Sequence, residues 1–92
     1  QEQAITIIKK TWRKDWRLGV AIAKAESGLR KTAFHQNTNG SRDFGYFQIN
    51  STHKIDVSDP VANAAFAYIL YREQGTQPWS ASKHNWSAVA RK

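Results

Sequence analysis

The residue with the clearest chemical potential is Glu26, one of seven Asp and Glu residues in a chain of 92. It follows a small, largely apolar run, Val20-Ala21-Ile22-Ala23-Lys24-Ala25, and precedes Ser27-Gly28, which is typical of a helix end. Apolar surroundings and the negative end of a helix dipole both disfavour a carboxylate anion. The pattern therefore predicts a raised pKa for Glu26, as a general acid requires. The alternative is an ordinary exposed glutamate in a last helical turn.

A second carboxylate, Asp43, lies seventeen residues later in a polar segment. Its neighbours include Asn37, Thr38, Asn39 and Ser41. A hydrated setting of this kind would keep the carboxylate ionised, although an ordinary turn aspartate would look the same. An acid with a raised pKa opposite an ionised carboxylate is an arrangement that can cleave glycosidic bonds. The acid protonates the leaving oxygen, and the carboxylate stabilises or attacks the developing oxocarbenium centre.

Residues 45–50 alternate in the way that is typical of a strand. One expected face carries Tyr46, Gln48 and Asn50, and the other carries Phe47 and Ile49. The apolar pair can enter the core, so the amides on the opposite face can line a groove. Their paired donors and acceptors suit hydroxyl and acetamido groups. A merely solvated strand face would show the same alternation.

Two helices are expected to precede these groups. Over residues 3–14, Ile5, Ile8 and Trp12 recur at helical spacing. Asp15 can cap a second helix, which ends at Gly28 and holds Glu26 in its last turn.

A hairpin and a central helix are expected to follow. Asn39-Gly40 indicates a two-residue turn between short extended runs. Asp59-Pro60 is typical of a helix start, and residues 61–71 are apolar almost all round before Gly75 ends the helix. The tail, residues 77–92, predicts a loop and a short last helix. The expected fold class is α+β, mostly α-helical, with a small β-hairpin lobe and a central buried helix.

Composition limits the class of protein. A chain of 92 residues with 40% hydrophobic residues fits one small domain, so we expect residues 1–92 to form a single domain. The absence of cysteine excludes disulfides, thiolate metal sites and cysteine nucleophiles. The apolar runs are too short for a membrane span, and the first twenty residues lack a signal-peptide pattern. Because the chain begins with Gln1, we expect a mature or excised segment.

The formal charge of +7 is concentrated in the first third of the chain. The basic residues there are Lys9, Lys10, Arg13, Lys14, Arg17, Lys24, Arg30 and Lys31. Such a field attracts nucleic acid, phospholipid headgroups or an anionic cell wall, or serves only as a solvated face. Nucleic-acid modules interleave aromatics with the basic cluster, whereas Trp12 and Trp16 are expected to face inward, so we do not expect nucleic-acid binding. Neither a metal nor a cofactor is expected, because the histidines, His35, His53 and His84, lack ligand spacing.

Two stretches together resemble the core of the lysozyme superfamily. They are Ala21-Ile22-Ala23-Lys24-Ala25-Glu26-Ser27-Gly28-Leu29 and Asn37-Thr38-Asn39-Gly40-Ser41-Arg42-Asp43-Phe44-Gly45-Tyr46-Phe47-Gln48-Ile49-Asn50-Ser51. The resemblance extends over roughly residues 18–82. It includes both animal C-type lysozymes and bacterial and phage lytic transglycosylase domains. It implies a single lysozyme-like catalytic domain.

The resemblance also implies roles for particular residues. Glu26 would be the general acid, and Asp43 would occupy the place of the second carboxylate of C-type enzymes. Trp79 falls where those enzymes keep a tryptophan against the acid. The substrate-binding residues expected on this basis are Gln48, Asn50, Tyr46, Trp79 and Ser27.

The chain departs from the C-type pattern in ways that leave the reaction open. It lacks their cysteines, and His53-Lys54 stands where they often have cleft tryptophans, so it is more similar to the short bacterial and phage domains. The leading hypothesis is a muramidase that cleaves the β-1,4 bond between N-acetylmuramic acid and N-acetylglucosamine in peptidoglycan. The first alternative is a lytic transglycosylase that leaves 1,6-anhydro ends at that bond. The second is a non-catalytic cell-wall-binding module.

The expected partners are peptidoglycan glycan strands and, through the basic residues, an anionic cell-wall surface. We expect a monomer that is extracellular, cell-wall-bound or phage-associated.

Overall fold

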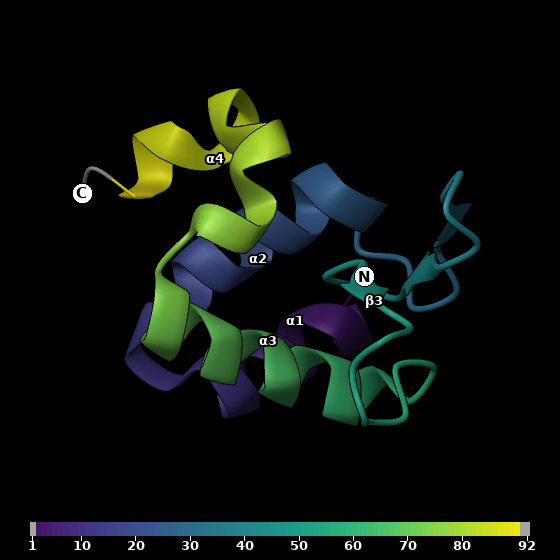
Figure 1. Ribbon diagram of the computed structural model, residues 1–92. Helices are drawn as coiled ribbons and strands as arrows, with labels where there is room; N and C mark the ends of the chain where they lie inside the picture. Colours follow the sequence, from purple (N-terminus) through teal and green to yellow (C-terminus); the bar gives the residue numbers. More distant parts are fainter. Residues whose placement is uncertain (1, 91–92) are drawn as a thin grey trace.

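The computed structural model describes residues 2–90, in which six helical segments pack together with a short sheet. The elements in chain order are α1 (Glu2–Trp12), the 3-10 helix η1 (Arg13–Asp15), α2 (Trp16–Ser27), β1 (Phe34–Gln36), β2 (Arg42–Phe44), β3 (Ile49–Asn50), α3 (Pro60–Gln74), the 3-10 helix η2 (Gln77–Ser82) and α4 (Lys83–Ala90). Figure 1 shows the strands and their loops projecting to one side of the helices. This arrangement confirms the predicted mostly helical α+β class. None of the described helices is long and apolar enough to cross a membrane.

The first two helices cross closely around Trp12, which is fully buried. A Cβ atom on Gly19 of α2 would lie 2.6 Å from Cδ2 of Trp12, so only glycine fits at this crossing. Helix α1 ends at Trp12 rather than at residue 14, because Arg13 adopts a positive φ of 52° and η1 follows. The close approach of α1 and α2 therefore depends on the absence of a Cβ atom at Gly19.

The predicted helix-capping residues behave differently from one another. Gly28 ends α2 in the left-handed conformation, with φ of 63°, as expected. Asp59 caps α3 as expected, accepting a hydrogen bond from Ala62 N at 2.9 Å. The prediction that Asp15 caps α2 is wrong, because its side chain makes no cap hydrogen bond. Oδ2 of Asp15 instead accepts a hydrogen bond of 2.8 Å from the Tyr68 hydroxyl and so links η1 to α3.

Helix α3 packs one face into an aromatic core. Its buried residues are Asn63, Ala64, Ala67 and Leu70, whereas Val61 and Ile69 are exposed on the other side. The indole of Trp12 donates to Ala64 O at 3.2 Å and stacks on Phe47 with ring centroids 5.0 Å apart. The core thus joins α1, α3 and the segment that follows β2.

The three strands form an antiparallel sheet in the order β1-β2-β3. His35 pairs with Asp43 across β1 and β2, and Asp43 pairs with Asn50 across β2 and β3. The predicted hairpin is present, but its connection runs over residues 37–41 instead of the two-residue Asn39-Gly40 turn. Asn37 N donates to Ser41 O at 2.8 Å to close it.

The prediction of a continuous strand over residues 45–50 is wrong. Residues 45–48 form a turn, and only Ile49 and Asn50 are in a strand. Gly45 and Gln48 have positive φ angles of 76° and 50°, so the chain does not keep the alternation of a strand. Tyr46 accordingly points into the protein and is only 2% exposed.

Candidate active site

Two adjoining cavities lie where α2, the sheet and η2 meet. Both are lined by Glu26, Asp43 and Gln48. The lobe cavity, of about 380 Å³, is completed by Arg30, Ala33, Phe34 and His35. The helix cavity, of about 310 Å³, is completed by Ile49, Asn50, His53, Leu70, Pro78, Trp79 and Ala81. Together they make one groove with the two predicted carboxylates at its middle.

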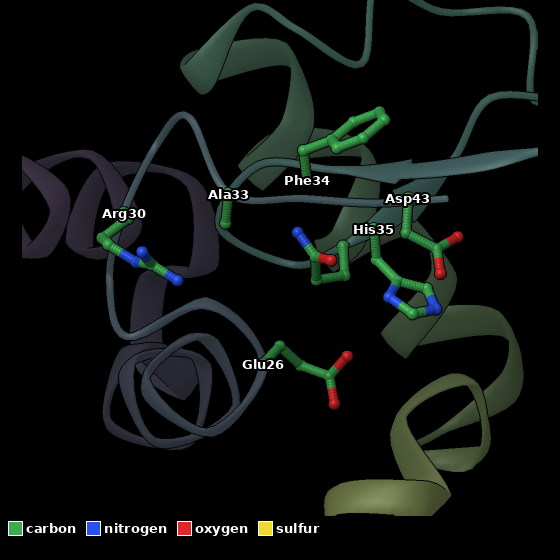
Figure 2. A pocket seen from close by; sticks show the side chains of 7 residues that line it. Glu26, Arg30, Ala33, Phe34, His35 and Asp43 are labelled. Carbon is green, nitrogen blue, oxygen red and sulfur yellow. The ribbon is translucent and has the colours of Figure 1, made fainter. Parts of the chain in front are cut away.

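Glu26 projects into the groove from the last turn of α2 and is half-buried. Figure 2 shows its carboxyl group facing the cavity that Asp43 lines from β2. Burial raises the pKa of Glu26 above its usual range, and the negative charge of Asp43 adds to that rise. The Ser82 hydroxyl acts on this pKa in the opposite direction. A carboxyl group that keeps its proton longer than usual can act as a general acid.

Asp43 is held by side chains from neighbouring strands. Nδ2 of Asn50 donates to Oδ1 of Asp43 at 3.0 Å and to the Ser41 hydroxyl at 3.1 Å. Oδ1 of Asn50 in turn accepts hydrogen bonds from the backbone and hydroxyl groups of Thr52, at 3.0 and 2.8 Å. The amide of Asn50 is therefore fixed with its donor toward Asp43, which orients one carboxylate oxygen.

Trp79 forms an apolar part of the wall that the groove shares with Glu26. The indole is only 2% exposed, and its Nε1 donates to Phe47 O at 3.0 Å. Its ring meets those of Phe47 and Trp12, each with centroids 6.0 Å away. Trp79 is thus anchored in the core while it lines the helix cavity with Glu26.

Comparison with known families matches residues 10–81 to the lysozyme-like domain. The chain belongs to this family. Among curated proteins, Protein IpgF of Shigella flexneri and Protein IpgF of Shigella sonnei are each 54% identical to it over 33 residues. That stretch is 36% of this chain and 22% of each relative, so the chain matches about a fifth of the length of these proteins. Family membership supports action on peptidoglycan.

The structure brings five of the seven predicted site residues of this lysozyme-like domain to one groove. They are Glu26, Asp43, Gln48, Asn50 and Trp79. Gln48 donates from Nε2 to Gly45 O at 3.0 Å, which stabilises the tight turn before β3. Its place in both cavities follows from that turn rather than from the strand that the sequence indicated.

The placements of Tyr46 and Ser27 need correction. Tyr46 lines neither cavity, because the turn over 45–48 directs its side chain into the core. Ser27 is 3% exposed, and its hydroxyl donates to Ala23 O at 2.9 Å inside α2. Neither side chain therefore faces the groove.

Sequence analysis overlooked several groups in and around the groove of the lysozyme-like domain. Arg30, Phe34, His35 and His53 line it, and the buried Ser82 lies behind Glu26. The Ser82 hydroxyl accepts from Trp86 Nε1 at 3.0 Å and donates to Trp79 O at 3.2 Å. The expected hairpin does place a residue of the first strand beside Asp43, but its two-residue turn would have placed Gln36 there instead of His35. No cluster of three metal-ligating residues occurs among residues 2–90.

The basic first third also needs one correction. Trp16 does not face fully inward, because its ring is half-buried and lies under two cations. Lys9 Nζ is 4.5 Å and Arg17 Cζ 4.6 Å from the ring centroid. Trp12 is buried as predicted. Of the two tryptophans whose expected burial argued against nucleic-acid binding, only Trp12 is buried.

Proposed function

We propose that this lysozyme-like domain cleaves the β-1,4 bond between N-acetylmuramic acid and N-acetylglucosamine in peptidoglycan, with Glu26 as general acid and base. The observation that carries the proposal is the position of Glu26. Its carboxyl group is half-buried, has a raised pKa and shares a groove with Asp43. A carboxyl group with a raised pKa that shares a groove with a second carboxylate is suited to glycosidic bond cleavage.

In the first step, protonated Glu26 donates its proton to the glycosidic oxygen as the bond to the anomeric carbon breaks. The leaving sugar departs with that proton, and positive charge develops on the remaining ring. Asp43, oriented by Asn50, stabilises this charge or bonds to the anomeric carbon. Glu26 is then a carboxylate and can take a proton from the attacking nucleophile.

Water as the nucleophile gives hydrolysis and a reducing end. The ordered Asp43 carboxylate favours this outcome, because hydrolysis through a stabilised or covalent intermediate uses a second carboxylate. If the muramoyl 6-hydroxyl attacks instead, a 1,6-anhydro end forms and Asp43 is auxiliary. Membership in the lysozyme-like family supports this transglycosylase alternative as well.

The proposed place of action is the cell wall. Lys10, Lys14 and Arg17 are exposed on α1, η1 and α2, and they would hold the domain on an anionic wall surface through long-range attraction. We propose that the domain acts there as a monomer.

The deciding experiment compares wild type, Glu26→Gln and Glu73→Gln on purified peptidoglycan. Glu73 is exposed on α3 and lines neither cavity. Glu73→Gln therefore removes one carboxylate, as Glu26→Gln does, but outside the groove. We expect soluble fragments from wild type and Glu73→Gln but none from Glu26→Gln. Substantial release by Glu26→Gln would contradict the assignment, and wall binding without cleavage by wild type would favour a non-catalytic binding module.

Mass spectrometry of the fragments separates the two reactions. Reducing ends indicate hydrolysis, whereas ends lighter by one water indicate the 1,6-anhydro product.

A further inference from the structure

The two cavities that make up the groove, the lobe cavity and the helix cavity, differ in charge. The residues that complete the helix cavity include no lysine or arginine, whereas the lobe cavity contains Arg30. Figure 2 places Arg30 at the end of the lobe cavity opposite Asp43 and His35, with Glu26 between them. A ligand that crosses the carboxylate pair therefore meets a guanidinium group on one side only.

The guanidinium of Arg30 is held by the end of α2. Its Nε donates to Ser27 O at 3.0 Å, one of the last carbonyls of the helix. That contact uses the Nε–H group, so the N–H groups of the two terminal nitrogens remain as donors for a ligand. Two parallel N–H donors in one plane match the geometry of a carboxylate. Because one donor is already fixed, less conformational entropy is lost when a carboxylate binds.

An exposed aromatic ring borders the same cavity. Phe34 is 53% exposed although it is large and apolar, and its ring packs on Phe44 with centroids 5.3 Å apart. Packing on Phe44 fixes the ring at the rim of the cavity. The lobe cavity thus combines the apolar ring of Phe34 with the guanidinium group of Arg30. This combination suits a ligand that carries both methyl and carboxylate groups.

Peptidoglycan offers such a group only on its peptide-bearing sugar. The glycan sugars are neutral once the lactyl carboxyl of muramic acid is joined to the stem peptide, so the free carboxylates belong to that peptide. We infer that the lobe cavity binds the acidic stem peptide of a muramoyl residue beside the cleaved bond, with Arg30 pairing with a peptide carboxylate. This inference rests on the proposed function and adds the substrate feature that the groove selects.

The test uses two soluble glycan substrates of equal length. One carries intact stem peptides; from the other an amidase has removed the peptides, and the lactyl carboxyl groups that this frees have been converted to neutral methylamides. Both are free of phosphate polymers, so that carboxylates are the anionic groups that distinguish them. The quantity measured is the ratio of kcat/KM for the peptide-bearing substrate to kcat/KM for the bare glycan. Wild type is compared with Arg30→Gln, Arg30→Lys and the control Arg42→Gln.

Arg42 is a matched control because it is an exposed arginine on β2 that lines neither cavity. We expect wild type to prefer the peptide-bearing substrate and Arg30→Gln to lower the ratio about tenfold, mainly through KM, as the loss of a charge-assisted pair predicts. Arg30→Lys should recover part of the ratio, because it keeps the charge but loses the planar fork. Arg42→Gln should leave the ratio unchanged.

Two other outcomes overturn the inference in distinguishable ways. If wild type cleaves both substrates and Arg30→Gln lowers the two kcat/KM values equally, peptide recognition is wrong and the proposed glycosidase function stands. If wild type cleaves neither substrate, the proposed function fails and the inference fails with it. Thermal unfolding of each variant shows whether loss of the Nε contact to Ser27 disturbs the fold.

Discussion

A Cβ atom on Gly45 would lie 2.6 Å from Nδ2 of Asn63. That amide of α3 donates to Phe44 O and to Val57 O, both at 2.8 Å, and its Oδ1 accepts from Phe47 N at 3.1 Å. One buried side chain thereby fixes the turn that leads from Asp43 to Gln48. The geometry of the groove depends on this contact between the helical core and the sheet.

Gly45→Ala should destabilise the protein and impair catalysis. The added methyl group meets Asn63 and also forces alanine into a φ of 76°, so we expect a loss of about 1–3 kcal/mol in the free energy of unfolding. Urea denaturation measures this loss. Gly40→Ala is the control, because Gly40 has a φ of 90° but no atom within 4 Å of the added Cβ. Equal losses for both variants would show that the contact with Asn63 does not matter.

The raised pKa of Glu26 predicts a specific dependence of stability on pH. The folded protein holds this proton more tightly than the unfolded chain, so the stabilising contribution is full below the ordinary pKa of 4.5 and is lost as pH rises through the folded pKa. Glu26→Gln should therefore gain stability relative to wild type as pH rises across that range.

Urea denaturation at a series of pH values measures the gain, and Glu73→Gln, at an exposed position outside the groove, is the matched control. Cleavage by wild type should decline on the alkaline side as Glu26 loses its proton. A cleavage rate that does not change over the pH range in which Glu26 loses its proton would contradict its role as acid.

Asp43→Asn tests the electrostatic role of the second carboxylate. Loss of a charge that stabilises the transition state should lower kcat about a hundredfold with a smaller change in KM. Initial rates on soluble glycan fragments provide the measurement, with Asp56→Asn, an exposed aspartate outside the groove, as the control. Near wild-type turnover by Asp43→Asn would argue against a stabiliser or nucleophile and for the transglycosylase route.

Gly19→Ala should reverse the usual effect of this substitution inside a helix. Alanine normally favours a helix over glycine by about 1 kcal/mol, but here the methyl group would approach Trp12 Cδ2 to 2.6 Å and Ile8 Cγ2 to 2.9 Å. We expect a net loss of about 1–3 kcal/mol, measured by thermal or urea unfolding. Thr6→Ala, at an exposed position of α1, should change stability by no more than about 0.5 kcal/mol. A stabilised Gly19→Ala variant would mean that the two helices can move apart easily.

Binding to insoluble walls should depend on salt through the basic first third. Lys10→Gln with Lys14→Gln should weaken cosedimentation at low salt, and the difference should vanish near 1 M salt, where charges are screened within about 3 Å. Lys54→Gln with Arg72→Gln removes the same charge from later positions and should have a smaller effect. Equal losses from the two pairs would indicate that only net charge matters.

Sequence alone determined the local features of this protein. Helical spacing around Ile8 and Trp12, the cap at Asp59 and the left-handed stop at Gly28 arise from interactions between near neighbours, so they could be predicted without the fold. The same holds for Glu26, whose place at the end of an apolar helical run already indicated a raised pKa. That direction agrees with the structure, in which burial is the largest cause.

Tertiary contacts decided which side chains line the groove. A two-residue turn at Asn39-Gly40 would pair Gln36 with Asp43, whereas the longer connection pairs His35 with it, and a shift of one residue exchanges the faces of a strand. Asn63 likewise bends residues 45–48 into a turn, which buries Tyr46 and presents Gln48. These outcomes depend on contacts between residues far apart in the chain, whose energies no local pattern encodes.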